Sequence, residues 1–174
     1  ILENALYGWE GLYGANPSER SFSLRFAGVI RRAYEQSGHR VAILVDEYDK
    51  PMLQSIDDEE LQKYYRSTLK SFYGVLKTMD GYIKLGFLTG VTKFGKVSVF
   101  SDLNNLIDLS MNARFHSICG VTEEELHRDF EPDIRKLAEE QRMTFEEACQ
   151  KLKEDYDGYH FTYDVAGLYN PFSL

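Results

Sequence analysis

The sequence predicts an α/β fold with parallel strands, followed by a mainly helical extension. Three observations predict it. Residues 41–45 are apolar, rich in β-branching and followed by two adjacent carboxylates, which is typical of a buried parallel strand. A long amphipathic pattern separates this run from a second apolar run at 82–88, which is the order of a right-handed βαβ unit. Beyond residue 118 the patterns are those of helices.

The composition excludes several classes of function. The 174 residues are 43% hydrophobic and 14% aromatic, which suffices for a core. A net charge of −8 provides no basic field, so we expect no direct nucleic-acid binding by this segment. No apolar run is long enough to cross a membrane. Cys119 and Cys149 match no metal-binding spacing, which favours a reducing, cytoplasmic location.

The spacing of apolar residues, together with glycine and proline, predicts the helices and strands before residue 54. Residues 3–13 and 21–37 have helical periodicity, and Gly38 is a fitting stop for the second helix. The acidic strand follows at 41–46. Pro51 restricts what we expect to be a loop after this strand.

A helix over 58–78 should carry an apolar stripe that packs in the core, made of Leu61, Tyr64, Tyr65, Leu69, Phe72, Tyr73 and Leu76. The strand at 82–88 ends in Thr89. Because ligands bind beyond the carboxyl ends of parallel strands, we expect the acids of the first strand and Thr89 to lie side by side at a functional edge.

The remainder of the chain is predicted to be irregular over 97–118 and then helical. Thr122 and Thr144 each begin a capping-box pattern, so helices should begin at 123 and 145. Pro132 should begin or break another helix. Residues 156–163 alternate aromatic and turn residues, as in a short hairpin or clip.

The adjacent acids Asp46 and Glu47 match the Walker B pattern of P-loop ATPases. There the first acid holds Mg²⁺ and the second polarises the attacking water. An acidic, solvated turn is the alternative interpretation. The phosphate-cradling Gly-x-x-x-x-Gly-Lys-Ser/Thr motif is absent from the sequence. The nearest approach, at 90–97, ends in Val97 and follows the acidic strand, so we interpret it as a chance match.

Several motifs together resemble one family, the AAA-ATPase-like proteins: 41–51 (VAILVDEYDKP), 87–101 (FLTGVTKFGKVSVFS), 103–106 (LNNL), 118–126 (ICGVTEEEL), 156–159 (YDGY) and 169–173 (YNPFS). These are bacterial P-loop proteins that usually carry a C-terminal restriction-endonuclease-like domain. The resemblance spans about residues 20–174 and implies a partial P-loop NTPase (AAA-like) core. It implies a Walker B half at 1–118 and a helical extension at 119–174.

The resemblance also implies what lies outside this segment. The chain begins at Ile1 and not at Met, and we expect both ends to continue in a longer protein. A P-loop segment would precede Ile1, and a nuclease-like domain would follow Leu174.

The resemblance assigns roles by position. Asp46 would bind Mg²⁺ and with it ATP, and Glu47 would be the general base or water-orienting acid. Thr89 would sense the γ-phosphate. The alternative is that its hydroxyl only makes a hydrogen bond within the protein at the end of the strand.

Three basic residues are further candidates. Lys93 and Lys96 would offer charge to a phosphate, or would be solvated loop lysines. Arg114 would be an arginine finger acting in cis or from a neighbouring subunit.

Asp49 and Lys50 are expected to form a local ion pair; contact with phosphate or metal is the alternative.

Three functions remain open for the sequence. The first is the Mg²⁺-dependent catalytic half of an ATPase, inactive as an isolated segment. The second is a non-hydrolysing nucleotide sensor or protein-interaction module. The third is a metal-dependent nuclease, which is disfavoured because its acids would all lie in one loop. Without a P-loop strand, we expect the isolated segment to bind Mg-ATP weakly or not at all. The missing strand would also leave one edge of the 82–88 strand unpaired, and we expect the tail or a second copy of the chain to cover that edge.

Overall fold

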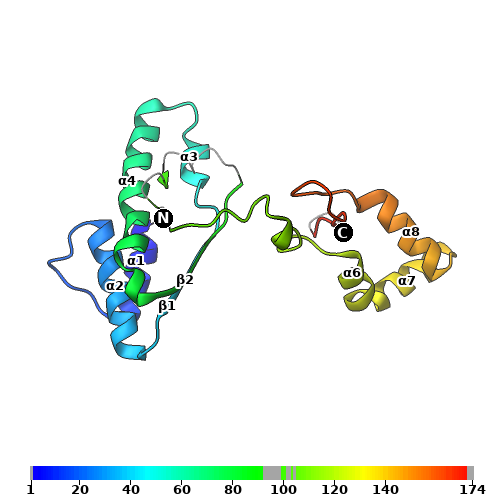
Figure 1. Cartoon of the computed structure of the whole chain (residues 1–174), viewed down its shortest axis with the longest axis horizontal. Helices are drawn as coiled ribbons and strands as arrows, with labels where there is room; N and C mark the ends of the chain where they lie inside the picture. The colour runs from blue at the N-terminus through cyan, green and yellow to red at the C-terminus, as the bar shows by residue number, and fades with distance from the viewer. Residues whose placement is uncertain (1, 92–98, 101–102, 104, 172–174) are drawn as a thin grey trace. The chain divides into compact units, whose positions relative to one another are not determined.

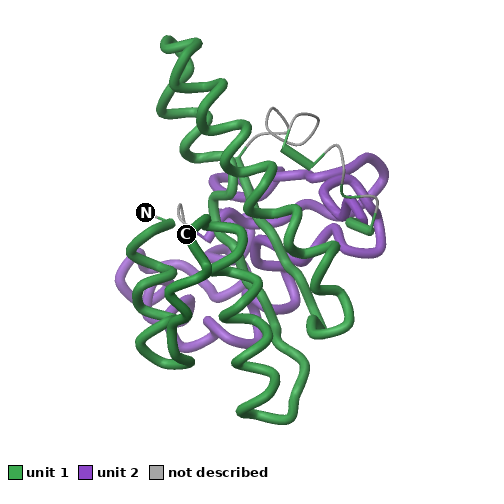
Figure 2. The backbone as a smooth tube through the Cα atoms, turned by 90° about the vertical axis from the view of Figure 1, so that its left-hand side faces the viewer, with its two compact units in different colours: residues 1–106 green, residues 107–174 purple. Residues whose placement is uncertain are grey.

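A computed structural model describes residues 2–91, 99–100, 103 and 105–171. The chain forms two compact units, Ile1–Leu106 and Ile107–Leu174 (Figure 2). Each unit has its own cluster of buried apolar side chains. No helix in the described parts of either unit has the length and apolar character that a membrane span requires.

The first unit alternates helices and strands in the predicted order (Figure 1). Its elements are α1 (Leu2–Tyr13), α2 (Phe22–Ser37), β1 (Val41–Val45), α3 (Lys50–Gln54), α4 (Glu59–Thr78), the 3-10 turn η1 (Asp80–Tyr82) and β2 (Ile83–Leu88). Every helix and strand expected here is confirmed to within a residue or so at its ends. The short helix α3 was expected to be a loop; Pro51 occupies its first turn, where a missing N–H costs nothing.

Local capping explains where these helices begin and end. The Ser21 hydroxyl accepts the N–H of Leu24 at 3.2 Å and begins α2. Gly38 ends α2 with φ of 68°, and its N–H reaches the Tyr34 carbonyl at 2.8 Å. The Asp58 carboxylate accepts the N–H of Leu61 at 2.9 Å and begins α4.

Strands β1 and β2 pair in parallel, which confirms the predicted βαβ arrangement. The register runs from Val41 opposite Ile83 to Val45 opposite Leu88, with an irregularity after Val41. In the described part of the chain β2 pairs with no strand other than β1. The covering of its free edge by the tail or by a second copy stays a prediction.

The described residues of the first unit cover only one face of this sheet. Ile43 lies in the core, whereas Leu44 and Leu85 are 73% and 51% exposed. The prediction of a buried strand after residue 40 is therefore wrong for the outer face of β1. The reason is that helices α1, α2 and α4 all pack on the Ile43 side of the sheet (Figure 1).

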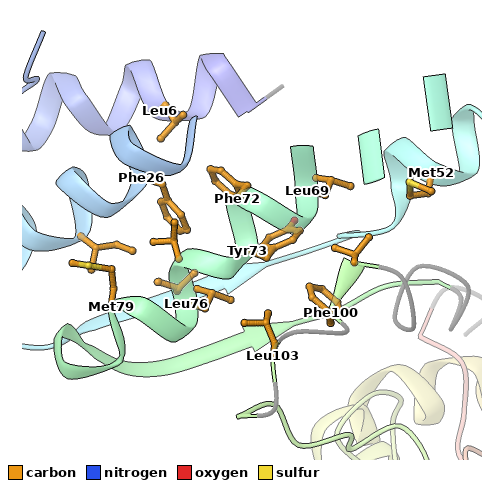
Figure 3. Close-up of a cluster of buried hydrophobic side chains, with 14 residues drawn as sticks. Leu6, Phe26, Met52, Leu69, Phe72, Tyr73, Leu76, Met79, Phe100 and Leu103 are labelled. Atoms are coloured by element: carbon orange, nitrogen blue, oxygen red, sulfur yellow. The ribbon is translucent and has the colours of Figure 1, made fainter. Parts of the chain in front are cut away.

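The core of the first unit is formed mainly by α1, α2 and α4 (Figure 3). Phe26 of α2 stacks on Phe72 of α4 with ring centroids 4.4 Å apart. Leu69, Phe72, Tyr73 and Leu76 of the expected stripe are buried. Leu61 and Tyr64, near the start of α4, are 36% and 57% exposed, so the stripe packs only along its later turns.

The second unit contains the 3-10 turn η2 (Ala113–Phe115) and helices α6 (Glu123–Asp129), α7 (Glu131–Gln141) and α8 (Phe145–Tyr156). Thr122 and Thr144 form complete capping boxes, so α6 and α8 begin where predicted. Pro132 lies in the first turn of α7. Antiparallel bridges join Tyr159 to Leu168 and Tyr169 to Val121.

Candidate functional site

The site begins where β1 and β2 end. Val45 lies opposite Leu88, so the residues that follow these two leave the sheet side by side. The Thr89 N–H donates to the Val45 carbonyl at 2.8 Å, and the Tyr48 N–H donates to the Thr89 carbonyl at 3.0 Å. Backbone hydrogen bonds therefore continue past the strands and hold the two loops together. We call this group the strand-end site and define it as Asp46, Glu47, Asp49, Lys50 and Thr89.

Asp46 and Thr89 are in direct contact. The Thr89 hydroxyl donates a hydrogen bond to Oδ1 of Asp46, which confirms the expected proximity of the two strand ends. Asp46 is exposed and Thr89 is half-buried. The carboxylate therefore lies at the surface while its position is set by the neighbouring strand.

The carboxylate oxygens of Asp46 are hard ligands of the kind that Mg²⁺ prefers. In the described part of the chain no cluster of three or more His, Cys, Asp or Glu side chains is arranged to hold a metal ion. Mg²⁺ in nucleotide sites typically takes one or two carboxylates and completes its shell with phosphate and water. The donor set fits such a nucleotide-bound ion and does not form an all-protein metal cage.

Glu47 has an unusual backbone conformation. Its φ is 53°, in the left-handed region that side chains other than glycine rarely adopt. Lys50 closes the turn by donating its N–H to the Glu47 carbonyl at 3.0 Å. The Lys50 Nζ lies 2.6 Å from Glu47 Oε2, and this hydrogen bond, followed by the charge of Glu47, raises the pKa of Lys50.

The expected ion pair between Asp49 and Lys50 is wrong, because Asp49 points elsewhere. Its side chain is buried, with 1% exposed, and its Oδ1 accepts the N–H of Val91 at 3.1 Å. Its carbonyl accepts the N–H groups of Met52 and Leu53, which begin α3. Asp49 therefore fastens the loop after β1 to the loop after β2, while Lys50 pairs with Glu47.

Gly90 is part of this fastening, which the sequence analysis did not identify. A Cβ atom at Gly90 would lie 2.5 Å from Tyr48 Cε1 and 2.9 Å from Asp49 Oδ1. The Tyr48 ring packs on Phe100 at a centroid distance of 4.8 Å. The loop after β2 can approach only because residue 90 has no side chain. The sequence signal that could have indicated this close approach is the glycine directly after Thr89 at the end of the strand.

Aromatic side chains pack around Tyr48, which follows Asp46 and Glu47 in the chain. Phe100 packs on Tyr73 of α4 as well as on Tyr48, at a centroid distance of 5.4 Å from Tyr73. Burial raises the pKa of Tyr73 to about 12, so this phenol is neutral at ordinary pH. Asp46 and Glu47 are exposed, and Tyr48, which follows them in the chain, packs against these aromatic side chains.

The remaining predicted site residues are Arg114, Lys93 and Lys96. Arg114 lies on η2 in the second unit, is exposed, and donates its backbone N–H to the Asn112 side chain at 3.0 Å. Lys93 and Lys96 lie outside the described residues. The structure thus brings together Asp46 and Thr89, with Glu47 adjacent in sequence.

A separate hollow of about 230 Å³ lies between α6 and α8 in the second unit, lined by Glu123, His127, Phe145, Glu146, Cys149, Gln150 and Lys153. Lys153 pairs with Glu123 at 2.9 Å. Burial, followed by the charges of Glu146 and Glu123, raises the pKa of the Cys149 thiol. A raised pKa lowers the fraction of this thiol that is present as the reactive thiolate.

Comparison with known proteins points to one family. A family model described as "Predicted AAA-ATPase" matches residues 1–100, which include the whole strand-end site. An uncharacterized protein encoded in the vnfD 5' region of Azotobacter chroococcum mcd 1 is 36% identical over 165 residues. That alignment covers 95% of this chain and 30% of the relative, so the chain spans less than a third of the relative's length.

No solved structure matches the chain. The family match ends at residue 100, so the later motifs that carry part of the resemblance lie beyond it. It nevertheless covers more than half of the 174 residues. The chain therefore belongs to the AAA-ATPase-like family of predicted ATPases.

Proposed function

We propose that this chain supplies the Walker B half of a Mg²⁺-dependent ATPase. The observation that carries the proposal is the hydrogen bond between Thr89 and Asp46 at the adjoining ends of two parallel strands. This is the edge of an open α/β sheet at which ligands bind. It places the carboxylate proposed for Mg²⁺ beside the Thr89 hydroxyl, which would turn from Asp46 to donate to a phosphate.

Each residue has one role in this proposal. An Asp46 oxygen holds Mg²⁺, directly or through water, and Thr89 contacts the γ-phosphate. Glu47 accepts the proton of the water that attacks the γ-phosphorus, and ADP leaves with the electrons of the broken P–O bond. The Mg²⁺ ion neutralises charge on the phosphate oxygens when it is bound.

The phosphate cradle has to come from outside the strand-end site. We propose that a P-loop in a longer protein provides it, and that Lys93, Lys96 and Arg114 add positive charge in the complete site. The 174 residues by themselves are expected to bind Mg-ATP weakly or not at all. A nuclease-like domain is the proposed partner on the other side of this segment.

A nucleotide sensor without turnover is the second candidate. The observation that favours it is the pairing of Glu47 with Lys50, because that glutamate oxygen is already occupied. A metal-dependent nuclease is less supported, because the described residues include no cluster of three metal-binding side chains.

The deciding experiment is Mg²⁺-dependent ATP hydrolysis by the longer protein, with Glu47→Gln as the variant. We expect kcat to fall by about 100-fold or more, the effect of losing a general base, while ATP affinity stays within about twofold. Glu59→Gln, at an exposed acid of α4, is the matched control and should leave kcat unchanged. Turnover that survives Glu47→Gln would favour the sensor.

A further inference from the structure

Lys50 belongs to the strand-end site but has no role in the proposed reaction. Lys50 is the first residue of α3, and Pro51 follows it in the same turn. Its ammonium lies 2.6 Å from Glu47 Oε2. The negative charge of Asp46, the proposed Mg²⁺ ligand, also raises the pKa of Lys50.

The conformation of Glu47 is held at two points. The Lys50 N–H binds the Glu47 carbonyl at 3.0 Å, and the Lys50 ammonium binds the carboxylate. A left-handed residue other than glycine persists only where its surroundings stabilise it, and such residues are often functional. The same lysine therefore stabilises both the backbone and the side chain of the proposed base.

An oxygen that already accepts a hydrogen bond from an ammonium is poorly placed to orient a water molecule. We propose that Lys50 is a positioning residue that holds Glu47 in a resting conformation, and that this ion pair opens before water is activated. The inference rests on the proposed function of Glu47.

The exposure of the pair suits a contact that has to open. The Lys50 and Glu47 side chains are 49% and 46% exposed. Ion pairs this accessible to solvent are weak and are screened by salt. A nucleotide that binds only the open arrangement can therefore shift the equilibrium with a small difference in affinity.

The first test compares steady-state ATP hydrolysis by the longer protein with Lys50→Gln and Lys50→Arg. We expect Lys50→Gln to raise kcat about two- to fivefold, with the KM for ATP changed by less than twofold. Lys50→Arg keeps the charge and should behave like the unsubstituted protein. Added salt should raise the kcat of the unsubstituted protein and leave that of Lys50→Gln unchanged, because the pair is already absent.

Lys63→Gln is the matched control. Lys63 pairs with Glu60 at 3.3 Å with the same three-residue spacing, but on the exposed surface of α4. Removing this pair should leave kcat unchanged. A fall in kcat or a large rise in KM for Lys50→Gln would overturn the inference, because it would mean that Lys50 acts on the nucleotide.

A second readout does not depend on turnover. Glu47→Gln should lower the pKa of Lys50, measured by NMR titration of its side chain in the 174-residue chain, because Glu47 raises this pKa. An unchanged pKa would show that the pair does not form and would overturn the inference. Turnover that is insensitive to Lys50→Gln would overturn the inference alone. Absence of ATP hydrolysis by both the unsubstituted longer protein and its Lys50→Gln variant would overturn the proposed function as well.

Discussion

The Thr89 hydroxyl donates a hydrogen bond to the Asp46 carboxylate across the ends of β1 and β2. The two residues are 43 positions apart in the chain, and the whole of α4 lies between them. Parallel pairing makes them neighbours, because Val45 and Leu88 are opposite each other in the register. The carboxylate proposed to bind Mg²⁺ is therefore oriented by the adjacent strand.

Replacing Thr89 by valine should impair turnover by the longer protein more than nucleotide binding. Valine has nearly the same shape but donates no hydrogen bond to Asp46. We expect kcat to fall about ten- to hundredfold, the range for losing a hydrogen bond to a charged group. Thr89→Ser keeps the hydroxyl and should retain most of the activity. Equal activity of the two variants would remove Thr89 from the proposed site.

Replacing Gly90 by alanine should destabilise the first unit by about 1–3 kcal/mol, the usual effect of overpacking. The new methyl group would meet Tyr48 and Asp49, and Tyr48 is held by Phe100. Urea unfolding at constant m-value measures the change. Gly86→Ala, on β2 with no atom within 4 Å of the added Cβ, is the control and should stay within about 0.5 kcal/mol.

The stability of the first unit should depend on pH through Glu10. Arg25 of α2 binds this carboxylate through two hydrogen bonds of 2.7 Å, which lower the pKa of Glu10. A lowered folded-state pKa means that the stabilisation is fully present above the unfolded-state pKa. It is lost as the pH falls through the folded-state value.

Glu10→Gln should therefore cost about 1.5–3 kcal/mol of unfolding free energy at neutral pH, and the difference should shrink in acid. Urea unfolding at a series of pH values checks this. Glu35→Gln, at an exposed position of α2, should show no such dependence. A Glu10→Gln effect that is constant with pH would contradict the role of the Glu10 charge.

Replacing Tyr169 by phenylalanine should stabilise the second unit by up to about 1 kcal/mol. The side chain is 1% exposed, and in the described part of the chain its buried hydroxyl has no hydrogen-bond partner. Burial raises the pKa of this phenol to about 12. Removing an unsatisfied buried hydroxyl removes a desolvation cost. Tyr159→Phe, at a 51% exposed tyrosine, is the control, and thermal unfolding compares the two.

The isolated chain should self-associate through its sheet. In the described first unit β2 has one free edge, and Leu85 and Leu44 are exposed on the outer face. Leu85→Lys places a charge on this face, and charges of this kind prevent edge-to-edge pairing. Sedimentation velocity should show a lower average mass for the variant. Lys84→Glu, at an exposed position of β2, tests whether charge alone is responsible.

The sequence by itself determined the local structure of this chain. Helices α6 and α8 begin where Thr122 and Thr144 predict, because a capping box involves only residues three positions apart. Gly38 ends α2 for the same local reason. The apolar run before Asp46 and Glu47 predicted a strand that delivers two acids to a sheet edge.

Only the tertiary structure decided how the strand-end residues pair. Lys50 was expected to form an ion pair with Asp49. The buried Asp49 instead accepts a hydrogen bond from the N–H of Val91, 42 positions away, and Lys50 forms its ion pair with Glu47. Likewise, an apolar strand cannot show which of its faces a helix will cover, and Leu44 is exposed. Strand register and helix placement arise from packing between distant segments, and a local pattern of residue types does not contain that information.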